Sequence, residues 1–488
     1  MIIRLVGNTW RYEMEKLSMA FFPDRKFQIL EPGKPEPEHL DPNQPVITVV
    51  RKEDSVTVTY QDEDRKKASV EPLREGTDPE LAAGRALYNT LSAVTGLRPK
   101  WGILTGVRPS KVMRNHLRTE TDKEAISYFE NALYVDPKKA ALAHTVARAE
   151  DVIIADSTPE SCSLYISIPF CPNRCTYCSF VSHSIGSPSA KKLFPQYYEK
   201  LLQEVERTGE ISAECGLTLR SIYIGGGTPS TLSSEQISGL LQCISRSFDL
   251  SSCSEFTFEA GRPDTTTAEK LRAIKEGGAD RISINPQSMT DDILQSVGRN
   301  HTVEDIKRTF REAREAGFQN INMDLIAGLP GDDPENFRRS LMEVLDLDPE
   351  SVTVHTLAIK RSASLIPTEE LFSRGNETSE MVDTSSELLY NNGYAPYYMY
   401  RQARSVGNLE NGGWAKPGME SRYNVYMMEE CHTILACGAG AVTKLKRPDS
   451  DDIHRLFNYK YPYEYINRFG ALMEQKRQIL EFHRESHS

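Results

Sequence analysis

The middle of the chain alternates regularly between short apolar runs and amphipathic segments, and no other feature constrains the fold as strongly. Helix-like segments between the runs begin at capping residues such as Ser233, Thr302 and Asp333. The runs have the length and apolar character of buried strands and span Leu164–Ile168, Ser221–Ile224, Glu255–Glu259, Arg281–Asn285, Ile321–Ile326 and Ser351–Leu357. Strands that alternate with helices pair in parallel. The pattern predicts an α/β fold, either an open sheet or a partial barrel, with ligands at the carboxyl ends of the strands.

The regions on either side of this alternation have a different character. Residues 1–160 contain two strand-like runs, Ile47–Val50 and Val56–Tyr60, and helical patterns from Pro79 onward. They predict an α+β N-terminal domain whose role the sequence does not give. Residues 161–360 form the alternating domain. Residues 361–488 are less regular and rich in aromatic residues and glycine, and we expect them to form an α/β domain that covers the substrate.

Three of the nine cysteines lie on one short loop directly after the first predicted strand: Cys171, Cys175 and Cys178. Three thiolates on such a loop can bind three irons of a [4Fe–4S] cluster, which leaves the fourth iron open to a small molecule. Structural zinc is an alternative, with His183 as a possible fourth ligand, and free thiols are another. The spacing favours the cluster.

Charge and composition narrow the class of partners. The chain has 58 basic and 69 acidic residues, a net charge of -11, which disfavours binding to a nucleic-acid backbone. It has no run of about 18 apolar residues, as a membrane span requires. Its start, Met1–Gly7, reads as a strand rather than a signal peptide. An odd number of scattered cysteines is not a disulfide framework. We therefore expect a cytoplasmic protein with no nucleic-acid partner and no membrane span.

The C-x3-C-x2-C loop, with the aromatic Tyr177 before its third cysteine, resembles that of the radical S-adenosylmethionine (SAM) superfamily. The resemblance implies a partial (β/α)6 TIM-like barrel in which SAM binds the open iron and yields a 5′-deoxyadenosyl radical. It also implies that the loop after the second strand holds the methionyl amino group, through Gly225, Gly226, Gly227 and Thr228. Successive glycines allow the backbone to approach a ligand closely.

Further matches to the superfamily stand at the ends of later strands. Their joint order, and the Gly-Leu-Pro-Gly that follows the strand-five aspartate, resemble the oxygen-independent coproporphyrinogen III oxidase-like family. By this resemblance the residues that bind polar groups of SAM are Glu259, Gln287, Arg299 and Asp324. Carboxylates suit ribose hydroxyls and a cationic sulfonium. The resemblance also implies that Tyr165 lies beside the cluster-bound SAM, and Ala358 near adenine or a second SAM.

The whole-length layout resembles the HemZ-type members of this family, through the stretches Met399–Gln402, Gly407–Asn411 and Tyr423–Glu430. Two departures from the family pattern bear on which substrate this protein uses. The well-characterised oxidases have a fourth cysteine where this chain has Phe180. The haem-chaperone branch has a His-Asn-x-x-Tyr-Trp segment, and the corresponding residues 423–428 lack its histidine, tyrosine and tryptophan.

The resemblance implies a radical SAM oxidoreductase that decarboxylates the propionates of coproporphyrinogen III to vinyl groups in haem biosynthesis, with an electron donor such as flavodoxin or ferredoxin. Methyl or alkyl transfer to a tetrapyrrole, with two SAM molecules, is an alternative. A haem chaperone is another, with Cys431, His432 or Cys437 as possible haem ligands. The propionates of a tetrapyrrole need cationic anchors, for which the candidates are Arg401, Arg404, Lys416 and Arg422.

Overall fold

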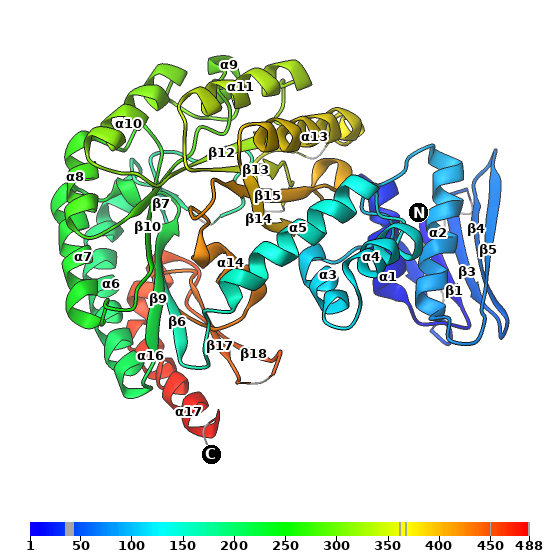
Figure 1. The fold of residues 1–488 in the computed structure, drawn as a ribbon, viewed down its shortest axis with the longest axis horizontal. Helices are drawn as coiled ribbons and strands as arrows, with labels where there is room; N and C mark the ends of the chain where they lie inside the picture. The colour runs from blue at the N-terminus through cyan, green and yellow to red at the C-terminus, as the bar shows by residue number, and fades with distance from the viewer. Residues whose placement is uncertain (35–42, 181, 361–362, 367, 449, 487–488) are drawn as a thin grey trace. The chain divides into compact units, whose positions relative to one another are not determined.

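The structure is a computed structural model that describes residues 1–488 except 35–42, 181, 361–362, 367, 449 and 487–488 (Figure 1). The chain forms two compact units, and neither is one continuous stretch of sequence. Unit 1 consists of Met1–Arg148, Ile366–Ser379 and Met399–Asn411. Unit 2 consists of Ala149–Leu365, Glu380–Tyr398 and Gly412–Ser488. Residues 361–488, expected as one C-terminal domain, contribute to both units.

Unit 2 is built on six parallel strands that are neighbours both in sequence and in space. Their order across the sheet is β6 (Ser161–Ile168), β9 (Thr218–Gly226), β10 (Glu255–Gly261), β11 (Arg281–Ile284), β12 (Ile321–Ala327) and β13 (Ser351–Thr356). Every neighbouring pair in this series is parallel. The order of these strands never reverses, whereas the strand order of a doubly wound sheet does. The predicted α/β fold is thus confirmed, and it is the partial (β/α)6 barrel.

Helices connect the six strands and lie along the outer side of the sheet in Figure 1. They are α6 (Pro188–Glu214), α7 (Ser234–Ser247), α8 (Ala268–Glu276), α9 (Asp291–Ser296), α10 (Val303–Glu315) and α11 (Pro334–Asp346). The expected caps are present: Ser233 and Thr302 form capping boxes, and Asp333 accepts a hydrogen bond from the Asn336 backbone N–H at 2.8 Å. The strands are buried almost throughout, because helices and inward-facing side chains cover both faces.

Strands from the last third of the chain extend this sheet at both edges. At one edge β15 (Glu410–Ala415) pairs antiparallel with β13, and β14 (Ala395–Arg401) follows it. At the other edge β16 (Thr433–Cys437) pairs in parallel with β6 and is followed by β17 (Val442–Lys446) and β18 (Ile453–Phe457). The remaining helices of this part are α13 (Gly375–Asn391), α14 (Arg422–Glu429), α15 (Pro462–Asn467), α16 (Phe469–Gln475) and α17 (Arg477–Ser486).

A buried carboxylate on α6 holds the last part of unit 2 in place. Glu204 is fully buried and accepts hydrogen bonds from the Gly438 backbone N–H at 2.7 Å, from Asn458 at 2.8 Å and from Tyr465 at 2.5 Å. Its partner of opposite charge is Lys476, with Nζ 3.0 Å from Oε1. A buried charge is tolerated only when it is paired and hydrogen-bonded in this way.

Unit 1 is an α+β domain, as predicted. Its sheet has the order β2–β1–β3–β4–β5, and its helices α1 and α2 bury Leu17 and Leu87 against Val49 and Val58 of the sheet. The predicted strands near residues 47 and 56 form an antiparallel pair, β3 and β4. The strands are β1 (Ile2–Val6), β2 (Gln28–Leu30), β3 (Val46–Arg51), β4 (Ser55–Gln61) and β5 (Lys66–Pro72).

The α-helices that lie wholly within unit 1 are α1 (Arg11–Phe21), α2 (Pro79–Thr95), α3 (Pro109–Leu117), α4 (Asp122–Ser127) and α12 (Glu369–Ser373). Helix α5 (Pro137–Ile154) continues from unit 1 into unit 2. Among the helices of the described residues, none is both long and apolar enough to cross a membrane.

Candidate functional site

The three-cysteine loop begins where β6 ends, at the carboxyl end of the barrel strands. Cys171 belongs to β7 (Phe170–Cys171), which pairs with β8 (His183–Ser184), and its carbonyl accepts a hydrogen bond from the Ile185 N–H at 2.8 Å. Cys171 and Cys175 are buried and Cys178 is half-buried. Burial raises the pKa of the Cys171 and Cys178 thiols, so these groups are neutral at pH 7 unless a metal binds them.

The thiols are not arranged around a single ion. No group of three or more His, Cys, Asp or Glu side chains among the described residues could hold a metal ion. This geometry does not form the four-ligand zinc site that the sequence left open with His183. In an iron–sulfur cluster each thiolate binds a different iron atom, so the sulfurs need not converge on one point. Three adjacent thiols on one anchored loop fit such a cluster.

Two arginines lie against the cysteine loop. The Arg262 guanidinium is 3.7 Å from the Cys175 sulfur and forms an ion pair with Asp264 at 2.7 Å. Arg299 donates to the Asn285 carbonyl at 2.6 Å and to the Tyr177 hydroxyl at 3.3 Å. The charge of Arg262 opposes the effect of burial on the pKa of Cys171, but burial outweighs it. The sequence analysis singled out Arg299 and Tyr177 but did not assign Arg262, which directly follows the end of β10.

The glycine loop after β9 packs directly on the cysteine loop. A Cβ at Gly227 would lie 2.6 Å from the Phe170 carbonyl oxygen and 3.0 Å from the Cys171 sulfur. A Cβ at Gly226, which has a φ of 115°, would lie 2.9 Å from the Ile168 nitrogen. The Thr228 hydroxyl donates to the Cys171 sulfur at 3.4 Å. The glycines are therefore required for the fit between two loops, whatever ligand they also contact.

Gln287 has the conformation and the unpaired atom of a ligand-binding residue. Its φ is 70°, in the left-handed region that side chains other than glycine rarely adopt. Its backbone is fixed there by bonds on both sides, from its N–H to the Asp324 carbonyl at 2.8 Å and from the Ile326 N–H to its carbonyl at 3.0 Å. Its side-chain Oε1 is buried without a hydrogen-bond partner. A strained backbone with an unpaired buried acceptor points to a functional site.

The two predicted carboxylates lie on β10 and β12, the strands on either side of β11, and their pKa values shift in opposite directions. Burial, together with the negative charge of Asp324, raises the pKa of Glu259 to about 8. Burial also opposes ionisation of Asp324, but hydrogen bonds from His355, Asn322 and Thr353 outweigh it and lower the pKa of Asp324. Asn322 donates to Asp324 at 2.7 Å. At neutral pH the site therefore contains one mostly protonated carboxyl group and one carboxylate, a difference typical of functional sites.

Three tyrosines stack inside the barrel beside Glu259. The ring centroids of Tyr223 and Tyr423 are 4.7 Å apart, and those of Tyr165 lie 6.3 Å from each. The Tyr423 hydroxyl is buried without a hydrogen-bond partner. Tyr165 was predicted here, whereas Tyr423 comes from α14 in the C-terminal part and no sequence signal placed it. Ala358 lies half-buried, two residues beyond β13.

Two of the proposed cationic anchors are in the wrong place for this site. Lys416 pairs with Asp348 at 2.7 Å, and Arg422 pairs with Asp156 at 2.5 Å. Both aspartates precede the barrel strands β13 and β6, so these pairs lie at the amino ends, opposite to the cysteine loop. Arg401 and Arg404 belong to unit 1.

His432 is not arranged as a haem ligand. Its ring is buried, with Nδ1 2.9 Å from the Ser157 hydroxyl and Nε2 2.8 Å from the Ser163 hydroxyl. Burial lowers its pKa to about 3. Cys437 is also fully buried, with its sulfur 3.3 Å from the Thr208 hydroxyl. Because both ring nitrogens of His432 are already engaged, axial ligation would require these bonds to break.

Known proteins resemble this chain in sequence and in fold. Residues 165–344 match the model of the Radical SAM superfamily. The oxygen-independent coproporphyrinogen-III oxidase-like protein HemZ of Bacillus subtilis (strain 168) is 39% identical over 399 residues, 80% of this chain and 79% of that protein. The heme chaperone HemW of the same strain is 34% identical over 281 residues, 57% of this chain and 70% of that protein. The structure of coproporphyrinogen III oxidase (HemN) from Escherichia coli superposes with a TM-score of 0.50 at 22% identity, over 67% of this chain and 73% of that chain, and shows the shared fold.

Proposed function

The chain belongs to the radical SAM superfamily and, within it, to the HemZ-type family of oxygen-independent coproporphyrinogen III oxidase-like proteins, and we propose that it is an oxidoreductase that acts on tetrapyrrole propionates. The proposed reaction is that of a coproporphyrinogen dehydrogenase in haem biosynthesis. Each conversion of a propionate to a vinyl group removes a hydrogen atom, CO2 and one further electron, which passes to an acceptor. The place of action is proposed to be the cytoplasm.

One observation carries this proposal: buried polar groups with unusual properties stand at the same strand ends as the cysteine loop. Gln287 has an unpaired acceptor on a strained backbone, and Glu259 and Asp324 have opposite pKa shifts. A purely structural barrel has no need of these features, because each costs free energy of folding. A bound ligand with hydroxyl and amino groups would satisfy them.

The roles proposed for the residues follow from their chemistry. Cys171, Cys175 and Cys178 hold one [4Fe–4S] cluster. The cluster and SAM, when bound, supply a 5′-deoxyadenosyl radical for hydrogen abstraction. Asp324, which is anionic at neutral pH, accepts hydrogen bonds from SAM hydroxyl or amino groups, and Gln287 accepts another through Oε1.

The other proposed contacts to SAM come from the same strand ends and loops. They are the backbone of Gly225, Gly226, Gly227 and Thr228, the side chains of Tyr165, Tyr177, Glu259 and Arg299, and the vicinity of Ala358. A second SAM near Ala358 belongs to the transferase alternative. An electron donor such as flavodoxin or ferredoxin supplies the reducing electron.

A haem chaperone is the second candidate, because the chain is 34% identical to a protein named as one. The bonded state of both His432 ring nitrogens counts against haem ligation at that residue. The two candidates differ in what happens to the tetrapyrrole: a chaperone binds haem and leaves a porphyrinogen unchanged.

An anaerobic assay separates these candidates. Reconstituted protein, expected to hold about four irons per chain, is incubated with SAM, a reductant and coproporphyrinogen III, and the products are identified by mass. Loss of CO2 with formation of 5′-deoxyadenosine supports the oxidase, and the Cys175→Ala variant should show neither. Tight haem binding without any decarboxylated product would contradict the oxidase. A gain in mass of a methyl or adenosyl group would identify a transferase instead.

A further inference from the structure

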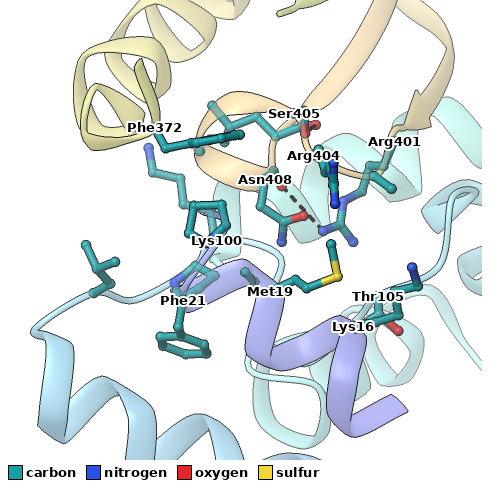
Figure 2. A pocket seen from close by; sticks show the side chains of 18 of the residues that line it. Lys16, Met19, Phe21, Lys100, Thr105, Phe372, Arg401, Arg404, Ser405 and Asn408 are labelled. Carbon is teal, nitrogen blue, oxygen red and sulfur yellow. Dashed lines mark hydrogen bonds between the residues drawn. The ribbon is translucent and has the colours of Figure 1, made fainter. Parts of the chain in front are cut away.

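Unit 1 contains a pocket of about 500 Å³ that belongs to a different part of the chain from the cysteine loop. Its walls come from four segments of this unit, within residues 12–24, 95–107, 372–379 and 401–409. A volume of this size is typical of sites for small organic molecules, which occupy about 300–1,000 Å³. Figure 2 shows the pocket between α1, the segment that follows α2, and the two C-terminal segments.

The charged residues that line the pocket are mostly cationic. Among the described lining residues, Asp24 is the only acid, whereas the cations are Lys16, Arg98, Lys100, Arg401 and Arg404. The whole chain has the opposite bias, a net charge of -11. A concentration of positive charge in one cavity of an acidic protein favours an anionic ligand.

One of these cations, Arg401, is buried in the wall of the pocket. Arg401 is only 4% exposed, and its guanidinium donates to the carbonyl oxygens of Leu104 and Asn408. The nearest carboxylate, Glu410, is already bound by Lys139 at 2.6 Å and by the Trp101 indole N–H at 2.8 Å.

Glu410 thus acts electrostatically on both Arg401 and Lys139. Burial lowers the pKa of Arg401 to about 10, which is the cost of an incompletely compensated charge. The Arg401 Nε is buried without a hydrogen-bond partner. Because buried charges in proteins are normally compensated, an anion beside Arg401 would complete this arrangement.

The opposite side of the pocket has aromatic rings, with Lys100 beside them. Figure 2 shows Arg401 and Arg404 together at one side, Phe21 and Phe372 at the other, and Met19 between them. Aromatic rings and a flexible thioether provide surfaces that accommodate flat ligands. A ligand that satisfies both sides has an apolar body and an anionic end.

We propose that this pocket binds a flat, apolar organic molecule whose carboxylate lies beside Arg401 and Arg404. This site is additional to the proposed radical SAM site and does not depend on the reaction proposed there. Carboxylates fit guanidinium groups in a paired geometry, and two neighbouring arginines discriminate strongly between a charged and a neutral end.

A matched pair of fluorescent probes tests the proposal on the full-length protein, with no SAM or reductant present. The probes are 1-pyrenebutyrate and the neutral 1-pyrenebutanol, which share the same flat body. The carboxylate should bind about tenfold more tightly than the alcohol, because it alone pairs with the arginines. Coproporphyrin III is measured in parallel: tighter binding than pyrenebutyrate assigns the site to a macrocycle with several carboxylates, and weaker binding assigns it to a smaller monoacid.

Charge-reversal variants locate the binding in the pocket. Arg404→Glu changes an exposed residue and Lys16→Glu a half-buried one, so folding should persist, which circular dichroism checks. Each should weaken pyrenebutyrate binding about tenfold or more. Lys66→Glu makes the same change on the exposed strand β5, outside the pocket, and should leave binding within about twofold.

Three results would overturn the proposal. One is equal binding of the acid and the alcohol, and another is equal binding by Arg404→Glu and Lys66→Glu. The third is displacement of pyrenebutyrate by inorganic phosphate at comparable concentration, which would show a site for small ions rather than flat organic acids. These three results can be interpreted even if the decarboxylation assay fails, because they are measured by ligand binding alone.

Discussion

Gln287 shows most directly how single residues of this protein are shaped for a ligand rather than for stability. Its left-handed backbone, with a φ of 70°, costs about 1–2 kcal/mol in a residue with a Cβ. Its buried Oε1 lacks a partner, which adds a further cost. Neither feature improves packing, and both persist because bonds to Asp324 and Ile326 fix the backbone.

The first prediction concerns the side-chain amide of this residue. Gln287→Ala should weaken SAM binding about threefold to thirtyfold, since one hydrogen bond is lost. It should not lower the melting temperature of the ligand-free protein, because the deleted acceptor is unpaired. Isothermal titration and thermal unfolding measure the two effects, with the exposed Gln242→Ala as control. A lower melting temperature with unchanged SAM affinity would mean that the amide is structural.

The second prediction uses the raised pKa of Glu259. With a pKa of about 8 in the folded protein against an ordinary 4.5, the folded state binds more protons than the unfolded state between these values. Stability should therefore fall as pH rises through this window, by at most about 1.4 kcal/mol per pH unit, and level off above pH 8. Asp324 has a lowered pKa, so its contribution is lost only in acid, below this window.

Glu259→Gln removes this dependence while it keeps the shape of the side chain. The difference in melting temperature between the variant and the unmodified protein should grow from pH 5 to pH 8 and then stay constant. The exposed Glu335→Gln on α11 serves as the control and should show no such trend. A difference that does not change with pH would show that Glu259 is ionised throughout.

At the scale of elements, the loops after β6 and β9 act as one unit, because the glycine loop is the surface on which the cysteine loop is built. Gly227→Ala would place a Cβ 2.6 Å from the Phe170 carbonyl oxygen, a backbone atom that cannot move away cheaply. We expect the cysteine loop to shift and iron content after reconstitution to fall to about half or less of the value for the unmodified protein. Gly470→Ala, which meets no atom within 4 Å, should retain full iron content. Full iron content in Gly227→Ala would show that the cysteine loop tolerates the displacement.

The sequence predicts elements well where pairing follows chain order. The six alternating strands could be placed because each strand pairs with the next along the chain, and the location of Glu259, Gln287 and Asp324 at one end follows from parallel pairing. The outer strands could not be placed, since β16 pairs with β6 across more than half of the chain. For the same reason the position of Lys416 and Arg422 at the amino ends of the strands could not be predicted from the sequence.

At the scale of the whole molecule, residues 416–423 connect the amino ends of the barrel strands with its interior. Glu255, the first residue of β10, accepts hydrogen bonds from the Ser421 hydroxyl at 2.9 Å and from the Arg422 backbone N–H at 2.5 Å. The Arg281 guanidinium, at the start of β11, donates to the Met419 carbonyl at 2.8 Å. These bonds fix the start of α14, and the next residue, Tyr423, enters the tyrosine stack beside Glu259.

The last prediction is that Tyr423 couples formation of the 5′-deoxyadenosyl radical to decarboxylation of the substrate. The Tyr423 hydroxyl is buried without a partner, so Tyr423→Phe should leave stability unchanged or raise it by about 1 kcal/mol. If the hydroxyl orients the tetrapyrrole, the variant should still form 5′-deoxyadenosine while decarboxylation falls about tenfold, because misplacement of a reacting group is costly.

Tyr426→Phe is the control. Tyr426 lies on the same helix but packs against His432, with ring centroids 4.2 Å apart, so this variant should keep the two rates coupled. Anaerobic assays that count both products per chain measure the ratio. An equal fall of both products in Tyr423→Phe would place the hydroxyl at SAM rather than at the substrate, and no change in either would remove Tyr423 from the site.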